Sequence, residues 1–269
     1  MTLPGQPPHR IDTSRAHSAR LYDYYLDGKD NYPVDWEAAE KVLGINPHMR
    51  TVAQANRAFM HRSTRWLATK AGIRQFLDIG TGIPTQPNLH QVAQEAAPDA
   101  RIAYADNDPI VLRHAEALMT STEQGRTAYL HADVTDPQSI LGNEELSTVL
   151  DLRRPVALSL NALLHFVPDD KRPYDIVQSL VDALAPGSYL VLSHCTGDFL
   201  PDVWSQLVDI YAEQKIGAQV RTKEEVLRFF DGLELMEPGL VVGHRWKPDQ
   251  PTGLTDAEVS LYAAVALKR

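Results

Sequence analysis

An acid followed by two spaced glycines is the stretch of this sequence with the clearest chemical meaning. Asp78, Gly80 and Gly82 have the spacing D-x-G-x-G, and the apolar residues of the run 76–79 surround the acid. The pattern predicts a short buried strand entering a glycine turn, because glycine accepts positive φ values and lets a ligand approach the backbone. A carboxylate here repels a phosphate and favours a positively charged ligand, so the turn predicts a site for an ammonium or sulfonium group.

Three more polar residues end apolar runs further along the chain. Asp106, Asp133 and Asn161 each follow such a run, and we expect them to gather near Asp78 because parallel strands present their carboxyl ends at one edge of a sheet. Asp106 lies about two dozen residues beyond the glycines, where an acid accepts hydrogen bonds from both hydroxyls of a ribose. Each residue taken alone has a second interpretation, as an ordinary turn residue.

The order of apolar runs and helical patterns indicates an α/β fold. Strands are predicted at 76–79, 100–105, 127–132, 155–160 and 189–193, with helices between them at 85–97, 108–119 and 171–184. This alternation predicts right-handed crossovers and a parallel sheet that is covered on both faces. Two strand-like runs, 233–242 and 261–267, then follow one another through a polar loop and predict an antiparallel hairpin.

A long helical segment precedes the first predicted strand. Helices are expected at 13–26, 35–43 and 47–70, and residues 1–8 are expected to fray. A segment of this length cannot bury its own apolar faces, so we expect it to pack over the ligand edge of the sheet or over its flank. The sequence therefore predicts two parts, a helical cap or lid at residues 1–72 and an α/β domain at residues 73–269.

These motifs together resemble a known enzyme class. The turn at Asp78 and the polar strand ends are similar to those of class I S-adenosylmethionine-dependent methyltransferases, although Pro84 stands where the class usually has a third glycine. Nearly the whole chain resembles one actinobacterial family of that class, long described as a domain of unknown function, through the motifs Tyr22-Asp23-Tyr24, Gly28-Lys29-Asp30, Asn56-Arg57-Ala58-Phe59 and Asn161-Ala162-Leu163-Leu164-His165. The resemblance implies a Rossmann-like fold with a seven-stranded, mostly parallel sheet that ends in an antiparallel hairpin. It also implies S-adenosylmethionine as the cofactor.

The resemblance implies roles for particular residues. Asp133 and Val134 match positions that bind the adenine amine, and Asn161 and Ala162 match positions beside the methionine portion. Asn107 would lie along the adenine face. The full set of implied cofactor-binding residues is Asp78, Gly80, Thr81, Gly82, Asp106, Asn107, Asp133, Val134, Asn161 and Ala162.

The pattern constrains the methyl-acceptor side less strongly. His165 and His194 follow predicted strands at the ligand edge, and histidine titrates in the range that a general base needs. Each has a second interpretation as a hydrogen-bonded structural histidine. Four residues of the N-terminal helices are candidates for substrate contact or for a lid: Tyr22, Tyr25, Arg57 and His61. The tyrosines have the alternative role of docking their helix on the domain.

Composition excludes several classes of protein. The formal net charge of −9 argues against a protein that grips nucleic acid backbone. Cys195 is the only cysteine, so no intramolecular disulfide can form, and no metal-ligand spacing is present. The absence of a membrane-length apolar run or an export signal predicts a soluble cytoplasmic protein.

The function predicted from the sequence is methyl transfer from S-adenosylmethionine to a small-molecule acceptor by direct displacement. A non-catalytic regulatory protein that binds S-adenosylmethionine or S-adenosylhomocysteine is the alternative. An NAD-dependent oxidoreductase is disfavoured, because G-x-G-x-x-G is absent and the carboxyl-terminal strands predict a hairpin. The sequence leaves the acceptor and the oligomeric state open.

Overall fold

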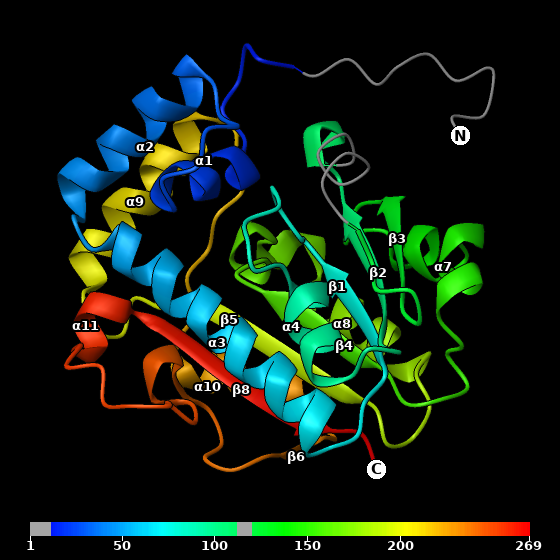
Figure 1. The fold of residues 1–269 in the computed structure, drawn as a ribbon. Helices are drawn as coiled ribbons and strands as arrows, with labels where there is room; N and C mark the ends of the chain where they lie inside the picture. The colour runs from blue at the N-terminus through cyan, green and yellow to red at the C-terminus, as the bar shows by residue number, and fades with distance from the viewer. Residues whose placement is uncertain (1–11, 112–119) are drawn as a thin grey trace.

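The computed structural model describes residues 12–111 and 120–269, which form a twisted sheet flanked by helices (Figure 1). The strands are β1 (Gln75–Ile79), β2 (Arg101–Asp106), β3 (Arg126–His131), β4 (Ala157–Asn161), β5 (Tyr189–Cys195), β6 (Glu234–Leu235), β7 (Val241–Val242) and β8 (Leu261–Leu267). Their order in the sheet is β3-β2-β1-β4-β5-β8-β6, and β7 also pairs with β8.

Strands β1 to β5 are mutually parallel, whereas β8 runs antiparallel between β5 and the short pair β6 and β7. The predicted parallel sheet with an antiparallel end is therefore confirmed. The run predicted as one strand at 233–242 forms two strands of two residues each. Pro238, which has no N–H to donate, and Gly239, at φ +82°, interrupt it.

Helices connect the strands and precede them. The α-helices are α1 (Ser18–Tyr25), α2 (Pro33–Ile45), α3 (Met49–Thr69), α4 (Leu89–Ala96), α6 (Pro137–Leu141), α7 (Glu144–Val149), α8 (Pro173–Asp182), α9 (Pro201–Glu213), α10 (Lys223–Leu227) and α11 (Asp256–Val259). Single 3-10 turns are η1 (Leu164–Phe166), η2 (Asp169–Lys171), η3 (Arg228–Phe230) and η4 (Gly243–Arg245).

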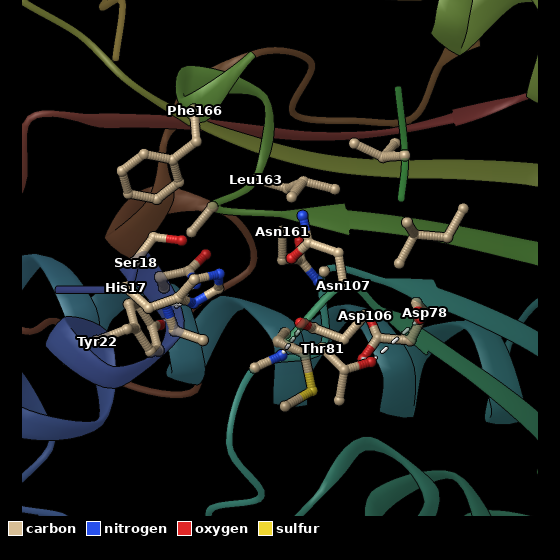
Figure 2. Close-up of a pocket in the computed structure, with 18 of the residues that line it drawn as sticks. His17, Ser18, Tyr22, Asp78, Thr81, Asp106, Asn107, Asn161, Leu163 and Phe166 are labelled. Atoms are coloured by element: carbon tan, nitrogen blue, oxygen red, sulfur yellow. Dashed lines mark hydrogen bonds between the residues drawn. The ribbon is translucent and has the colours of Figure 1, made fainter. Parts of the chain in front are cut away.

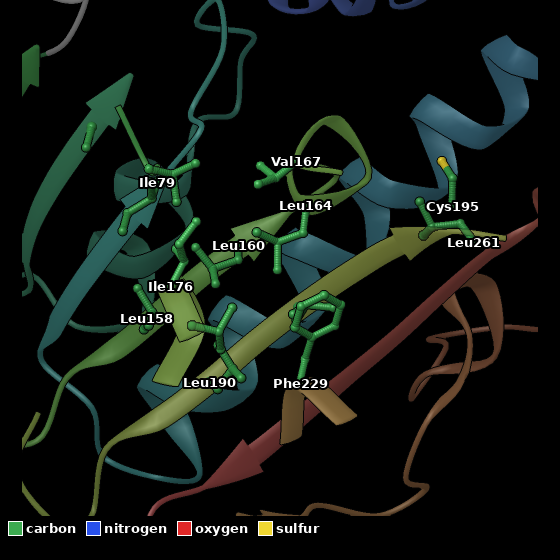
Figure 3. Packing of buried hydrophobic residues seen from close by; sticks show 14 of the residues in the cluster. Ile79, Leu158, Leu160, Leu164, Val167, Ile176, Leu190, Cys195, Phe229 and Leu261 are labelled. Atoms are coloured by element: carbon green, nitrogen blue, oxygen red, sulfur yellow. The ribbon is translucent and has the colours of Figure 1, made fainter. Parts of the chain in front are cut away.

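Both faces of the sheet carry an apolar core, because successive strand residues point to opposite faces. On one face Phe76 packs in a cluster with Phe59 and Leu67 of α3. On the other face Leu77 belongs to a larger cluster, part of which is seen in Figure 3, where Leu158, Leu160 and Leu190 of the sheet lie near Ile176 of α8 and Phe229 of η3. The buried strands are held in place from both sides, which fixes the edge where their carboxyl ends meet.

The N-terminal helices have two different relations to the sheet. Helix α3 crosses one face of the sheet, and its Phe59 ring meets Trp246 edge-on with 5.4 Å between ring centroids (Figure 1). Helices α1 and α2 lie together at one end of the molecule beside α9. The division at residue 72 between a cap and a sheet domain stays a prediction.

Helix boundaries differ from the sequence prediction in several places. The helix predicted at 85–97 begins only at Leu89, since Asn88 forms its N-terminal cap and Pro84 and Pro87 occupy the preceding turn. The short helices α6 and α7 were not predicted. Most of the helix predicted at 108–119, and the N-terminal residues predicted to fray, lie outside the described residues.

Within the described parts of the chain, no helix is both long enough and apolar enough to cross a membrane.

Candidate functional site

A cavity of about 850 Å³, including its open mouth, lies at the carboxyl ends of β1, β2 and β4. Its lining comes from these strand ends and from the N-terminal helices (Figure 2). The strand ends and their loops contribute Asp78, Ile79, Gly80, Thr81, Gly82, Asp106, Asn107, Ala132, Val134, Asn161, Ala162, Leu163 and Phe166, and the N-terminal segment contributes His17, Ser18, Ala19, Tyr22, Asn56, Arg57 and Met60.

The two glycines after β1 serve different steric needs. Both have positive φ, +73° at Gly80 and +66° at Gly82. A Cβ at Gly80 would lie 2.6 Å from the side chain of Leu163, whereas a Cβ at Gly82 would have no described atom within 4 Å. Gly80 therefore allows the loop after β4 to approach, and Gly82 supplies the positive φ of the turn.

Asp106 ties the end of β2 to the glycine turn. Its Oδ2 accepts a hydrogen bond from the Gly82 N–H at 2.8 Å, and its Oδ1 accepts one from the Asp108 N–H at 2.9 Å. The side chain is 8% exposed, and burial raises the pKa of Asp106 above its ordinary value. A carboxylate fixed in this way, at the rim of the cavity, can accept further hydrogen bonds from ligand hydroxyls.

Asp78 is the second acid of the cavity. Burial raises the pKa of Asp78 to about 7, although Ser159, Arg57 and Thr81 oppose this rise through hydrogen bonds or charge. The Thr81 Oγ1 lies 3.1 Å from the Asp78 carbonyl oxygen and 3.3 Å from its Oδ2. A carboxyl group with a raised pKa is stabilised in its charged form by a cation, so the site favours a positively charged ligand group.

The loop after β4 brings Asn161 and Ala162 to the same edge. The Asn161 Nδ2 donates to Ser159 Oγ at 2.7 Å, while the buried Asn161 Oδ1 has no hydrogen-bond partner in the described part of the chain. Ala162 has φ +51°, and its N–H donates to Ser193 Oγ at 2.8 Å. The cavity wall thus presents one buried amide oxygen that is able to accept a hydrogen bond from a ligand.

Asn107, Asp133 and Val134 lie around the ends of β2 and β3. Asn107 Nδ2 donates to Asp133 Oδ2 at 3.0 Å, and Asp133 Oδ1 accepts from the Thr135 N–H at 2.8 Å. Burial would raise the pKa of Asp133, but these hydrogen bonds outweigh it and lower the pKa. Asn107 and Val134 line the cavity, whereas Asp133 lines only the neighbouring hollow.

A second hollow of about 980 Å³, including its open mouth, adjoins the cavity. The two share the residues His17, Ser18, Asn107, Val134, Leu163 and Phe166 in their linings. The second hollow is also lined by Asp133, by Arg15 before α1 and by Lys215 and Ile216 after α9. The cavity therefore has a neighbouring space on the side where α1 meets the loop after β4.

The family model described as S-adenosyl methyltransferase matches residues 4–269 of the chain. The chain belongs to this family. As an S-adenosylmethionine-dependent methyltransferase, it has S-adenosylmethionine as its cofactor. The family assignment does not favour the non-catalytic alternative.

Solved structures agree with the assignment. A DUF574 family protein from Streptomyces avermitilis is 49% identical, with a TM-score of 0.94 over 97% of this chain and 100% of that chain. A candidate methyltransferase from Thermobifida fusca is 38% identical, with a TM-score of 0.90 over 98% of each chain. TnmH, 16% identical with a TM-score of 0.52 over 87% of this chain and 61% of that chain, is similar in fold alone. No curated protein matches the chain. The predicted actinobacterial family is confirmed.

The residues of this methyltransferase that face the cavity fit the cofactor. The charged form of Asp78 and the unpartnered Asn161 Oδ1 suit an ammonium group, and Asp106 suits ribose hydroxyls. The open space above Gly82 leaves room for a ligand against the turn. Among the described residues, no cluster of His, Cys, Asp and Glu could hold a metal ion.

The N-terminal candidates of the methyltransferase divide into two pairs. Tyr22 and Arg57 line the cavity, whereas Tyr25 and His61 lie outside its lining. Tyr25 is buried with its hydroxyl oxygen 3.5 Å from that of Tyr211, and His61 Nε2 lies 2.9 Å from the Pro87 carbonyl oxygen. Arg57 donates to the same Pro87 carbonyl at 2.7 Å. Burial raises the pKa of Tyr22 to about 12, so this phenol stays protonated at neutral pH.

Neither candidate general base of the methyltransferase reaches the cavity. His165 Nδ1 lies 3.5 Å from the Cys195 nitrogen, and burial, with the nearby Arg221 charge, lowers the pKa of His165 to about 3. His194 is fully buried, with its Nε2 2.8 Å from Arg221 Nη1 and its Nδ1 2.7 Å from the Cys195 carbonyl oxygen. The structure gives both histidines internal partners, which favours a structural role.

The cavity also contains residues that the sequence did not single out as functional. Figure 2 shows His17 and Ser18 on the N-terminal side of the cavity and Phe166 and Leu163 from the loop after β4. Leu163 belongs to the family motif 161–165 and Phe166 directly follows it, so both lie close to residues that the sequence indicated. No sequence pattern indicated His17, because the position of this residue depends on how α1 docks.

Proposed function

We propose that this methyltransferase transfers a methyl group from S-adenosylmethionine to a small-molecule acceptor that binds between α1 and the loop after β4. The observation that supports this proposal is that residues from two sides of the molecule line the cavity. The strand ends form one wall of it, and His17, Ser18 and Tyr22 form the opposite wall. A site bounded by a helix on this side suits a small molecule better than a polymer.

The cofactor would lie along the strand ends. Asp106 would accept the ribose hydroxyls, Asn107 and Val134 would border the adenine, and Asp133 would act through Asn107. Gly80, Thr81 and Gly82 would contact the cofactor from the turn. Asp78, Asn161 and Ala162 would surround the methionine portion. The cofactor supplies an electrophilic methyl group when bound; the chain supplies position, charge complementarity and exclusion of water.

The acceptor would approach through the second hollow. Ser18 and Phe166 line both spaces. The charged residues of the hollow have both signs: Arg15, Arg20 and Lys215 are positive, and Asp12 and Asp133 are negative. No general base is assigned to His165 or His194, since both have internal partners. The chain would then favour acceptors that react by positioning alone, such as a neutral amine or an ionised oxygen or sulfur.

Calorimetric titration with S-adenosylmethionine, S-adenosylhomocysteine and NAD tests the cofactor part of the proposal. Both adenosyl ligands should bind in the micromolar range, and NAD should not. Failure of both adenosyl ligands to bind would overturn the proposal. Release of S-adenosylhomocysteine from an acceptor panel of small amines, phenolates and thiols then tests turnover.

The approach through the second hollow has its own test once an acceptor is found. Ile216→Trp fills a position that lines the second hollow but not the cavity. It should raise the KM for the acceptor and leave cofactor affinity unchanged. Asp209→Trp, at an exposed position of α9, is the matched control. Equal KM values for the two variants would contradict this route.

A further inference from the structure

A continuous chain of hydrogen bonds joins α1 to the loop after β4 through the molecule's interior. It begins at the Ala162 N–H, which donates to Ser193 Oγ at 2.8 Å. Ser193 Oγ donates to Asn56 Oδ1 at 2.6 Å, and Asn56 Nδ2 donates to Tyr22 Oη at 2.7 Å. Tyr22 Oη donates in turn to the Ala53 carbonyl at 3.1 Å. Residues from α1, α3, β5 and the loop after β4 therefore share one connected set of bonds.

The direction of these bonds is the same at every step. Both hydroxyls, of Ser193 and Tyr22, accept one hydrogen bond and donate one, and the chain runs from a backbone N–H to a backbone carbonyl. Asn56 is the central member, because only its side chain both accepts from one hydroxyl and donates to the other. A carboxylate cannot donate and an aliphatic side chain can do neither, so the chain requires an amide at this position.

Burial makes the two central members, Asn56 and Ser193, dependent on their neighbours. Asn56 is 4% exposed and Ser193 is fully buried. A buried donor or acceptor that loses its partner cannot recover a bond to water, so loss of one bond is transmitted to the next member.

The two ends of the chain reach the wall of the cavity. Tyr22, Asn56 and Ala162 all line it. Figure 2 shows Tyr22 on the side of α1 and Asn161, next to Ala162, on the side of the strands. The hydrogen-bond chain therefore joins the two walls of the cavity. At one end it fixes the backbone of Ala162, which has φ +51°.

We propose that Asn56 is a positioning residue that couples the docking of α1 to the cofactor-binding loop after β4. The inference rests on the proposed placement of the cofactor against Asn161 and Ala162. The inference gives the two parts of the Tyr22 side chain different roles. The phenol hydroxyl influences cofactor affinity through Asn56 and Ser193, and the ring forms part of the cavity wall.

Asn56→Leu tests the coupling directly. The substitution retains the side-chain size but removes both hydrogen bonds, and the Kd for S-adenosylhomocysteine should rise roughly tenfold. Asn46→Leu is the matched control, because Asn46 is 2% exposed, bonds to the His48 N–H at 3.0 Å and lies outside the cavity lining. The control should lower the melting temperature and leave the Kd unchanged.

A double-mutant cycle separates coupling from a loss of stability. Tyr22→Phe and Ser193→Ala each remove one hydroxyl, and these two side chains bond to Asn56 rather than to each other. Their effects on the Kd should depart from multiplicativity by at least about twofold. If Asn56→Leu does not fold, this double-mutant cycle still tests the coupling through Asn56.

Two results would overturn the coupling. One is a Kd for S-adenosylhomocysteine that is unchanged in Asn56→Leu while the melting temperature falls, and the other is strictly multiplicative effects in the cycle. Absence of binding by the unmutated protein would instead overturn the proposed function together with this inference, so the two failures are distinguishable.

Discussion

The two acids that line the cavity differ in their surroundings, since Asp106 is buried and Asp78 is half-buried. Asp106 accepts backbone hydrogen bonds from Gly82 and Asp108, so it is fixed in place before any ligand arrives. Asp78 is held less by hydrogen bonds than by burial, and its pKa is raised to about 7. Hydrogen-bonding geometry is therefore the expected contribution of Asp106, and charge is the expected contribution of Asp78.

Asp106→Ala should weaken binding of S-adenosylhomocysteine by roughly 2 kcal/mol or more, because charge-assisted hydrogen bonds to the ribose hydroxyls would be lost. Calorimetric titration gives the change in affinity, and circular dichroism checks that the variant is folded. A folded variant with unchanged affinity would remove Asp106 from the site.

Affinity for S-adenosylmethionine should rise about tenfold between pH 6 and pH 8, since the cation favours the ionised form of Asp78 and that carboxyl has a pKa of about 7. Burial raises the pKa of Asp106 too. Titration calorimetry across this range measures the effect, and Asp78→Asn should flatten it. A steep rise that persists in Asp78→Asn would assign the pH dependence to another group.

A rise in pH has the opposite effect, through Asp78, on the stability of the ligand-free protein. The folded-state pKa of Asp78 lies above the ordinary value near 4, so the folded protein binds more protons between about pH 4 and pH 7. Asp78 therefore lowers the stability of the ligand-free protein as pH rises through that window. Cofactor binding offsets this cost, which is the expected behaviour of a site prepared for a cation.

At the scale of elements, helix α1 is docked by a buried ion-pair cluster. Arg20 Nε lies 3.2 Å from Asp108 Oδ2, and Arg20 Nη1 lies 3.5 Å from Asp35 Oδ2. All three side chains are buried, and Asp108 lies two residues after Asp106, the last residue of β2. The ion-pair cluster therefore joins α1 and α2 to the end of β2. This strand end carries Asp106, the residue proposed to bind the ribose hydroxyls.

Arg20→Met should lower the free energy of unfolding by about 3–5 kcal/mol, because two buried carboxylates lose their cationic partner. Arg50→Met is the matched control, since Arg50 pairs with Asp27 at the surface and its loss should change stability by about 1 kcal/mol or less. Urea denaturation of both variants measures the difference. Equal effects would show that the Arg20 cluster is not a buried anchor.

At the scale of the whole molecule, the N-terminal segment is continuous with the core. Leu21 and Tyr25 of α1 belong to the same apolar cluster as Leu77 and Leu160 of the sheet. The larger cluster thus extends from the sheet to the helices that border the cavity. We therefore expect the N-terminal segment to be an integral wall of the site rather than a loosely attached cover.

Deletion of residues 1–32 should lower both the melting temperature and the affinity for S-adenosylhomocysteine, because it removes α1, Arg20 and the wall of the cavity. Differential scanning calorimetry and titration calorimetry measure the two effects. If the truncated chain melts like the full chain and loses only cofactor affinity, α1 is a separable lid.

The sequence by itself determined the sheet and the edge where a ligand binds. An apolar run, an acid and two glycines around Asp78 form a local pattern, and so do the polar ends of the strands at Asp106 and Asn161. These residues lie at one edge of the sheet because parallel strands all have their carboxyl ends on the same side. The family motifs added the cofactor, since they span segments that the fold brings together.

Only the tertiary structure decided which side chains face the cavity. His165 lies between Leu163 and Phe166 in the sequence, yet those two line the cavity while His165 turns inward toward Cys195. His17 lines the cavity because α1 is docked by contacts to Asp35 and Asp108. The direction in which a side chain points depends on contacts with residues that are distant in the sequence. A local pattern of residue types does not specify those contacts.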